Sequence, residues 1–251
     1  MIADVLPAPV IAYDTFTDAP RDALLPEEHA VVATAVEKRR REFTTVRALA
    51  RTAMHALGYP PAPVLPNRRG APGWPEGLVG SMTHCEGYRA AALACAVDMI
   101  AVGIDAEPNA PLPDGVLEAV SLPAERAWIS DLTAVRGEVS WDRLLFSIKE
   151  TVFKAWYPRT RYELDFEQAE VTVSPQSHTF TCRLILPEQA PPSSWLTDTQ
   201  GRWLVRDGLL VTSLAVAAGW APVPALGAEP PAAAPSAPSG PRPPRGRTGC
   251  R

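Results

Sequence analysis

The sequence predicts an α+β fold built from two similar halves, and three observations support this prediction. Apolar residues recur at helical intervals over about residues 27–57, and they do so again, more strongly, over residues 139–157. Several short apolar runs of strand length follow each helical pattern. Because a helix followed by consecutive strands is typical of α+β proteins, we expect a long helix packed on a small antiparallel sheet in each half.

In the first half, the helical pattern ends at Gly58, and the two prolines that soon follow prevent its continuation. A connector rich in proline and glycine then leads to Gly77. Strands are expected after this connector, at about residues 78–82, 89–97 and 100–104.

In the second half, a shorter helix is expected over about residues 123–132, ahead of the main helix. The pair Asp207-Gly208 separates two apolar runs and is typical of a hairpin turn. The halves, residues 1–100 and 101–220, show no clear sequence identity, so their pseudo-symmetry is predicted from the order of elements alone. The expected strands lie at about 169–173, 178–186, 202–205 and 209–217.

Composition limits the classes of protein that fit this chain. With 251 residues, 46% of them hydrophobic, the chain can bury a substantial core, whereas residues 221–251 are rich in Pro, Ala and Gly and are predicted to form a disordered tail. That tail contains four Arg and one Glu, so the rest of the chain has 20 basic and 27 acidic side chains, which disfavours a general nucleic-acid-binding protein. The four cysteines of the chain form no CxxC pair, which fits a reducing cytoplasm. No apolar run is long enough to span a bilayer, so we expect a cytoplasmic protein without membrane attachment.

A first candidate site is the motif VGIDAEP at residues 102–108. On an extended segment, Asp105 and Glu107 lie two positions apart, so their carboxylates project from the same face. Two such oxygen ligands suit a hard cation such as Mg²⁺. Taken alone, so short a motif more often marks a strand that ends in solvated acids.

A second candidate site lies in the motif FSIKETVFKAWYP on the strongest helical pattern of the second half. Glu150 follows Lys149 directly, and Lys154 lies one helical turn after Glu150 on the same face. An ordinary surface ion pair is the simplest alternative. The surrounding apolar residues argue against that alternative, and they are Phe146, Val152, Phe153, Ala155 and Trp156.

Two further motifs indicate anion binding. In GLVGSMTHCEGY, the hydroxyls of Ser81 and Thr83 can donate to phosphate oxygens and His84 can add a donor or a charge, although a lone histidine is often structural. In EKRRREFTTVRALAR, residues 37–51, six basic and two acidic residues are present. Arg40 and Arg47 share a helix face with Arg39 near its edge, an arrangement suited to a ligand with several phosphates unless the face is merely solvated.

Together these motifs resemble the signatures of the larger, two-halved 4'-phosphopantetheinyl transferases of the surfactin-synthetase-activator and enterobactin-associated type, and most of all their actinobacterial members. The family pattern is GID followed by an acid two residues later and, further along, a helix bearing KE and another lysine. Residues 103–105, Glu107, Lys149, Glu150 and Lys154 match it in order. The likeness extends over about residues 36–220 and includes RREF, RRGAPGWPEG, SMTHC and SLPAERAW.

The resemblance implies a fold of two pseudo-symmetric halves with coenzyme A in the cleft between them, the first half holding its phosphates and the second providing the metal and catalytic residues. Asp105, Glu107 and Glu150 would coordinate Mg²⁺, with Mn²⁺ as a substitute, and Glu150 would either accept a proton or only bind the metal. Lys154 would stabilise the transferring or leaving phosphate. The coenzyme A phosphates would be held by Arg39, Arg47, Arg69, Ser81, Thr83, His84 and Lys154.

The implied activity is transfer of the 4'-phosphopantetheine of coenzyme A to a serine of an apo acyl or peptidyl carrier protein, with release of adenosine 3',5'-bisphosphate, by a monomer. Two other classes remain open from the residues. A Mg²⁺-dependent nuclease would also use two acids and a lysine, but it would need a basic groove. A coenzyme A or nucleotide-binding module would bind its ligand whether or not magnesium is present.

Overall fold

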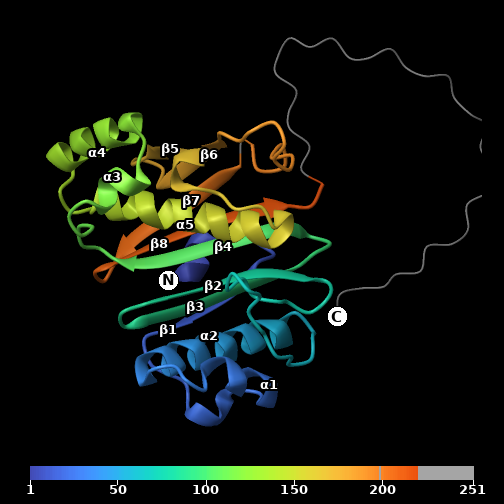
Figure 1. The fold of residues 1–251 in the computed structure, drawn as a ribbon. Coiled ribbons are helices and arrows are strands. Elements are labelled where there is room, and N and C mark those ends of the chain that lie inside the picture. The colour runs from blue at the N-terminus through green and yellow to red at the C-terminus, as the bar shows by residue number, and fades with distance from the viewer. Residues whose placement is uncertain (198, 220–251) are drawn as a thin grey trace, which may run out of the picture.

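The computed structural model describes residues 1–197 and 199–219, and the predicted tail at 221–251 lies outside them. Two antiparallel sheets lie side by side, each covered by one long helix (Figure 1). This arrangement confirms the predicted α+β fold with two similar halves.

The helices are α1 (Pro26–His29), α2 (Glu37–Ala56), α3 (Val116–Val120), α4 (Pro123–Val135) and α5 (Trp141–Thr160), with 3₁₀ turns at η1 (Ile2–Val5), η2 (Arg21–Ala23), η3 (Ala30–Val32) and η4 (Phe166–Gln168). The strands are β1 (Ile11–Thr15), β2 (Leu78–Cys85), β3 (Tyr88–Cys95), β4 (Met99–Pro108), β5 (Ala169–Ser174), β6 (Thr179–Leu184), β7 (Gln200–Arg206) and β8 (Leu209–Ala217).

The first sheet has the strand order β1-β3-β2, with α2 on one face. Every residue of its central strand β3 is buried. Since successive side chains point in opposite directions, both faces of this strand are covered. Ala91 and Leu93 pack with Ala50 and Met54 of α2, whereas Ala92 and its neighbours on the other face belong to a different cluster. The small side chains of β3 therefore let two layers approach it closely.

The second sheet has the strand order β4-β8-β7-β6-β5, and α5 packs across β4 and β8. Asp207 and Gly208, at the predicted hairpin between β7 and β8, have φ values of 53° and 75°. Positive φ at both positions is what a two-residue hairpin turn requires, so this prediction is confirmed. The core under α5 includes Trp141, Leu144, Ile148, Val152 and Trp156.

A third apolar cluster joins the two halves. It contains the free face of β3, residues of β4 such as Val102 and Ile104, and Ile2 and Val5 from the N-terminal turn η1. Both sheets contribute to this cluster, so the halves share one continuous interior rather than a thin linker. Within the described residues, no helix is both long and apolar enough to cross a membrane.

The helix expected over residues 27–57 is divided in the structure. α1 and η3 end before Ala35, Val36 is extended with ψ of 156°, and α2 begins at Glu37. The Arg40 guanidinium donates to the carbonyls of Val32 (3.1 Å) and Ala33 (2.7 Å), which satisfies groups that a continuous helix would bond internally. The prediction of one helix was wrong because apolar periodicity does not show such a side-chain cap.

Strand β1 was not predicted. It is a short edge strand of five residues that pairs antiparallel with β3, from Ile11 opposite Leu93 to Thr15 opposite Arg89. An edge strand exposes part of its surface, and Asp14 interrupts its apolar pattern. Its position is fixed by the sheet that it joins rather than by its own sequence.

Gly103 lets α5 approach β4 closely. A Cβ built on Gly103 would lie 2.1 Å from the carbonyl oxygen of Thr151 and 3.0 Å from the backbone nitrogen of Ala155. These are backbone atoms, so no side-chain rotation can relieve the contact. Glycine at this position therefore sets the distance between α5 and the strand that bears Asp105.

We predict that Gly103→Ala lowers the free energy of unfolding by about 1–3 kcal/mol or more, because overpacking at a rigid contact displaces backbone. Chemical denaturation followed by circular dichroism measures the change. Gly137→Ala is the matched control, since its nearest neighbouring atom lies at 3.8 Å, an ordinary contact distance. Equal stabilities of the two variants would contradict the role assigned to Gly103.

Candidate active site

Asp105 is a buried carboxylate, 4% exposed, at the boundary between the halves. Its Oδ1 accepts hydrogen bonds from Thr83 Oγ1 (3.1 Å) and Lys154 Nζ (2.6 Å). Its Oδ2 accepts one from Ser147 Oγ (2.8 Å). Thr83 belongs to β2, whereas Ser147 and Lys154 belong to α5, so a single carboxylate links the two halves.

The edge strands β2 and β4 are joined by side-chain hydroxyls. Ser81 Oγ accepts from the backbone N–H of Ile104 (3.2 Å), and Thr83 Oγ1 accepts from that of Ala106 (3.1 Å). Both hydroxyls were expected to bind phosphate, but these contacts give them a structural task as well. Ser81 nevertheless lines the main cleft described below, whereas Thr83 does not.

Glu107 and Glu150 occupy the same region as Asp105. Arg143 donates to Glu107 Oε2 (3.1 Å), whereas Glu150 has no hydrogen bond or ion pair among the residues that the structure describes. Burial raises the pKa of Glu107, and the charge of Asp105 adds to this effect despite Arg143. Burial also raises the pKa of Glu150, and Lys154 only partly offsets it.

The chemistry of these three carboxylates fits a hard cation such as Mg²⁺, which prefers oxygen ligands. Their environment fits too, because burial raises the pKa of two of them and a cation would favour their ionised forms. At present Lys154 and Arg143 supply positive charge to Asp105 and Glu107. Over the described part of the chain, no three His, Cys, Asp or Glu side chains are already gathered as a ligand set.

A cleft of about 620 Å³ is lined by Glu150 and Lys154, whereas Asp105 and Glu107 are not among its lining residues. Its walls come from α2, β2, α5 and the loop at residues 66–72, so both halves enclose it. Glu150 lines one part of it together with Phe153 and Tyr157 of the same helix. Its positively charged or imidazole side chains are Arg39, Arg47, Arg68, Arg69, His84 and Lys154.

Comparison with known proteins identifies the family. A model of the 4'-phosphopantetheinyl transferase N-terminal domain matches residues 27–94, and a model of the 4'-phosphopantetheinyl transferase superfamily matches residues 101–212. The chain belongs to the 4'-phosphopantetheinyl transferase superfamily. The family resemblance noted in the sequence is thereby confirmed.

Three relatives in this superfamily align with most of the chain. The 4'-phosphopantetheinyl transferase Svp of Streptomyces mobaraensis is 58% identical over 87% of this chain and 90% of its own length. The 4'-phosphopantetheinyl transferase PptT of Mycobacterium tuberculosis is 44% identical over 85% of this chain and 97% of its own. The 4'-phosphopantetheinyl transferase Npt of Nocardia iowensis is 43% identical over 86% of this chain and 100% of its own.

Arg39 and His84 lie next to each other on the wall of the cleft. Arg39 NH1 lies 3.0 Å from His84 Nε2, and Glu42 Oε2 lies 3.4 Å from the same nitrogen. Burial lowers the pKa of His84 to about 4, and the positive charges of Arg39 and Lys154 act in the same direction. At neutral pH His84 is therefore an uncharged hydrogen-bonding group, and Arg39 provides the charge.

Arg47 lines the cleft, but the protein uses much of its guanidinium. Arg47 Nε donates to the carbonyl of Val64 (2.9 Å), and its carbon Cζ lies 3.1 Å from the centre of the Phe43 ring. Burial lowers the pKa of Arg47 to about 9, although Glu28 opposes this effect. Arg47 thus differs from the exposed phosphate ligand that the helical ridge suggested.

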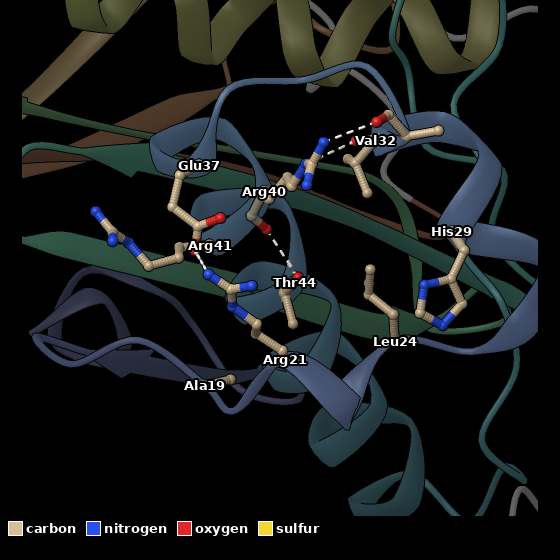
Figure 2. A pocket seen from close by; sticks show the side chains of 10 residues that line it. Ala19, Arg21, Leu24, His29, Val32, Glu37, Arg40, Arg41 and Thr44 are labelled. Atoms are coloured by element: carbon tan, nitrogen blue, oxygen red, sulfur yellow. Dashed lines mark hydrogen bonds and ion pairs between the residues drawn. The ribbon is translucent and has the colours of Figure 1, made fainter.

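The expected ridge is also divided between two pockets. Arg40, which was expected on the face of Arg47, lines a separate pocket of about 280 Å³ with Arg21 and Arg41 (Figure 2). There Arg21 pairs with Glu37 (2.7 Å), and Arg40 donates to backbone carbonyls. Arg39, eight residues before Arg47, is the member of the triplet RRR at 39–41 that faces the main cleft.

The connector contributes two arginines to the cleft. Arg69 was predicted there and forms an ion pair with Glu163 of the other half. Arg68 also lines the cleft and was missed, although its place in the doublet RR was a visible signal. Lys149, in contrast, points away from the cleft into a buried ion pair with Glu125 (2.7 Å). Lys149, the lysine of the KE pair, is thus part of the core.

We predict that the imidazole of His84 stays neutral down to about pH 5, because its pKa is lowered to about 4. The neutral form is favoured by folding, so this group stabilises the protein above pH 6.5, and that contribution is lost as the pH falls towards 4. Titration of the His84 ring signals by NMR, assigned with a His84→Gln variant, measures the pKa. A midpoint near 6.5 would contradict the burial and charge effects described here.

Proposed function

We propose that this chain transfers the 4'-phosphopantetheine of coenzyme A to a serine hydroxyl of an apo acyl or peptidyl carrier protein. Membership of the superfamily supports this activity. So does the observation that one cleft is lined by arginines, here called its basic end, and by Glu150 with Lys154, the partner of Asp105, here called its acidic end. The serine oxygen attacks the β-phosphorus of coenzyme A. The bond from that phosphorus to the bridging oxygen breaks, and adenosine 3',5'-bisphosphate leaves with the oxygen.

The basic end suits the negatively charged 3'-phosphoadenosine end of coenzyme A. Arg39, Arg68 and Arg69 place fixed positive charge there, and neutral His84 adds a hydrogen-bonding nitrogen. Guanidinium groups bind phosphate oxygens in pairs, which orients the ligand as well as attracting it. In this proposal Arg47 contributes chiefly by keeping the cleft wall in place. Ser81 and Thr83 join β2 to β4 and so form the seam between the two halves.

The acidic end suits the reacting diphosphate. Asp105, Glu107 and Glu150 would hold Mg²⁺ or Mn²⁺, which when bound neutralises the negative charge that builds up on the diphosphate oxygens. Lys154 lies 2.6 Å from Asp105 and one helical turn from Glu150, so its ammonium is placed to stabilise the transferring or leaving phosphate. Burial raises the pKa of Glu150, which makes this carboxylate a stronger base for the serine proton.

We propose further that the enzyme acts as a monomer and that carrier proteins dock on a local surface. Both ends of the cleft come from one chain, so a monomer in the cytoplasm suffices for the reaction. Carrier proteins are typically acidic, and this chain has a net charge of −4, so docking depends on local basic or apolar surface rather than on overall attraction.

We predict that the wild-type protein adds about 340 Da, the mass of one phosphopantetheine, to an apo carrier protein in the presence of coenzyme A and Mg²⁺, and that a chelator abolishes this gain. Intact-protein mass spectrometry over several carrier classes gives the readout. Binding of coenzyme A without any gain in mass would mean a binding module instead of a transferase.

We predict that Glu150→Gln slows transfer by about 10²- to 10⁴-fold, the usual contribution of a general base, and a comparable loss is expected if Glu150 binds the metal. Glu118→Gln, at an exposed acid on α3, is the matched control and retains the wild-type rate. Initial rates from the same mass assay give the comparison. A wild-type rate in Glu150→Gln would remove Glu150 from the mechanism.

A further inference from the structure

Each half contains the same buried structure built around one glutamate. The sequences Leu-Pro-Glu-Glu at 25–28 and Leu-Pro-Ala-Glu at 122–125 open the short helices α1 and α4. Glu28 and Glu125 are 0% and 1% exposed. Each accepts a hydrogen bond from the backbone N–H three residues before it, at 3.0 Å in the first half and 2.7 Å in the second. This repeat is the clearest sequence trace of the two-fold pseudo-symmetry.

Each glutamate also binds a cation on the long helix of its own half. Glu28 accepts from Arg51 of α2 at 3.0 Å, and Glu125 accepts from Lys149 of α5 at 2.7 Å. The separations along the chain, 23 and 24 residues, are nearly equal. A buried charge is tolerated only when it is paired and hydrogen-bonded, so each pair fixes a short helix against a long one.

Each glutamate finally holds the backbone of a segment that borders the active site. Glu28 Oε1 accepts from the N–H of Val64 (2.9 Å), while Arg47 donates to the carbonyl of the same residue. Glu125 Oε1 accepts from the N–H of Val171 (2.8 Å), while Lys149 donates to the carbonyl of Phe166 (2.9 Å). Each glutamate therefore holds a backbone segment outside its own helix, and the segment held differs between the two halves.

In the first half, the clamped residue is the base of the arginine loop, residues 65–73. The loop is closed by hydrogen bonds from Gly73 N to Leu65 O (2.8 Å) and from Asn67 N to Ala71 O (2.9 Å). Asn67 Oδ1 accepts further bonds within it. A loop closed in this way moves as a unit, so the contact at Val64 sets where Arg68 and Arg69 enter the cleft.

In the second half, the clamped groups border Glu150. Lys149 precedes Glu150 on α5, and a smaller pocket of about 230 Å³ is lined by both residues together with Phe153 and Phe166. Displacement of Lys149 would rotate this turn of α5 or shift the segment at Phe166. Either change alters the direction of the Glu150 carboxylate.

We propose that Glu28 and Glu125 are positioning residues with different tasks: Glu28 sets the affinity for coenzyme A through the arginine loop, and Glu125 sets turnover through the alignment of Glu150. This inference rests on the proposed function and deepens it. The two glutamates have the same burial, the same capping bond and the same kind of ion pair. Each is therefore the matched structural control for the other.

The experiment compares Glu28→Gln with Glu125→Gln in full-length protein. Glu28→Gln is expected to raise KM for coenzyme A about tenfold with kcat changed less than about twofold, because a charge-assisted contact at the loop base is lost. Glu125→Gln is expected to lower kcat about tenfold with KM for coenzyme A nearly unchanged. Lys38→Gln, which removes an exposed ion pair on α2, should change neither constant.

Calorimetric titration of coenzyme A without metal or carrier separates this inference from the proposed function. If the wild type binds coenzyme A but transfers nothing, the proposed function fails, and the affinity of Glu28→Gln still tests the clamp. If a glutamine variant does not fold, Glu28→Asp and Glu125→Asp, which keep the charge, should show the same split in smaller measure. Folded variants with wild-type constants, or variants that both change the same constant, would overturn the proposal.

Discussion

The hydrogen bonds of the Asp105 carboxylate hold the two halves in the relative position on which the cleft depends. One bond comes from β2 of the first half and two come from α5 of the second. A buried carboxylate needs all of its partners, because an unpaired charge in a protein interior costs roughly 3–5 kcal/mol. The seam between β2 and β4 is made by the hydroxyls of Ser81 and Thr83, and Thr83 binds the carboxylate and the backbone of β4 at once.

The two similar halves perform different tasks because they bring different side chains to the cleft. Each half supplies a long helix and a sheet edge, but α2 and its connector present arginines to the cleft, whereas α5 presents Glu150 and Lys154, and Lys154 pairs with Asp105 of β4. The two signs of charge meet at Lys154, which pairs with Asp105 and also lines the cleft. Groups fixed in this way need little rearrangement when a charged ligand enters, and such preorganised electrostatics is a large source of rate enhancement.

The fold was predictable from the sequence where periodicity was strong and neighbours were close in the chain. The helices α4 and α5 and most of the strands follow from local patterns. The strand at 100–104 was expected with those of the first half, but β4 pairs with β8 in the second sheet, and this pairing joins residues far apart in the chain. The break at Val36 and the edge strand β1 do not, because a guanidinium cap and pairing with β3 decide them. Local patterns therefore define the elements, whereas contacts between distant residues define their ends.

Prediction of the cleft residues from the sequence was limited in the same way. The family resemblance implied that Arg39, His84, Glu150 and Lys154 share one site, and the structure puts all four on the cleft wall. The sequence did not separate Arg47 from Arg39, since both are arginines on one helix and only burial against Phe43 and Val64 distinguishes them. The sequence likewise does not distinguish Lys149 from a surface lysine, because its partner Glu125 lies 24 residues away in the chain and meets it only in the folded core.

The most direct test of a ligand site shared by the two halves is a crystal structure of this protein with coenzyme A and Mg²⁺. We predict that the diphosphate lies between Lys154 and Glu150 on one side and that the adenosine phosphate lies against Arg39 and His84 on the other. Coenzyme A bound in the pocket of Arg21, Arg40 and Arg41, or held by one half alone, would contradict this arrangement.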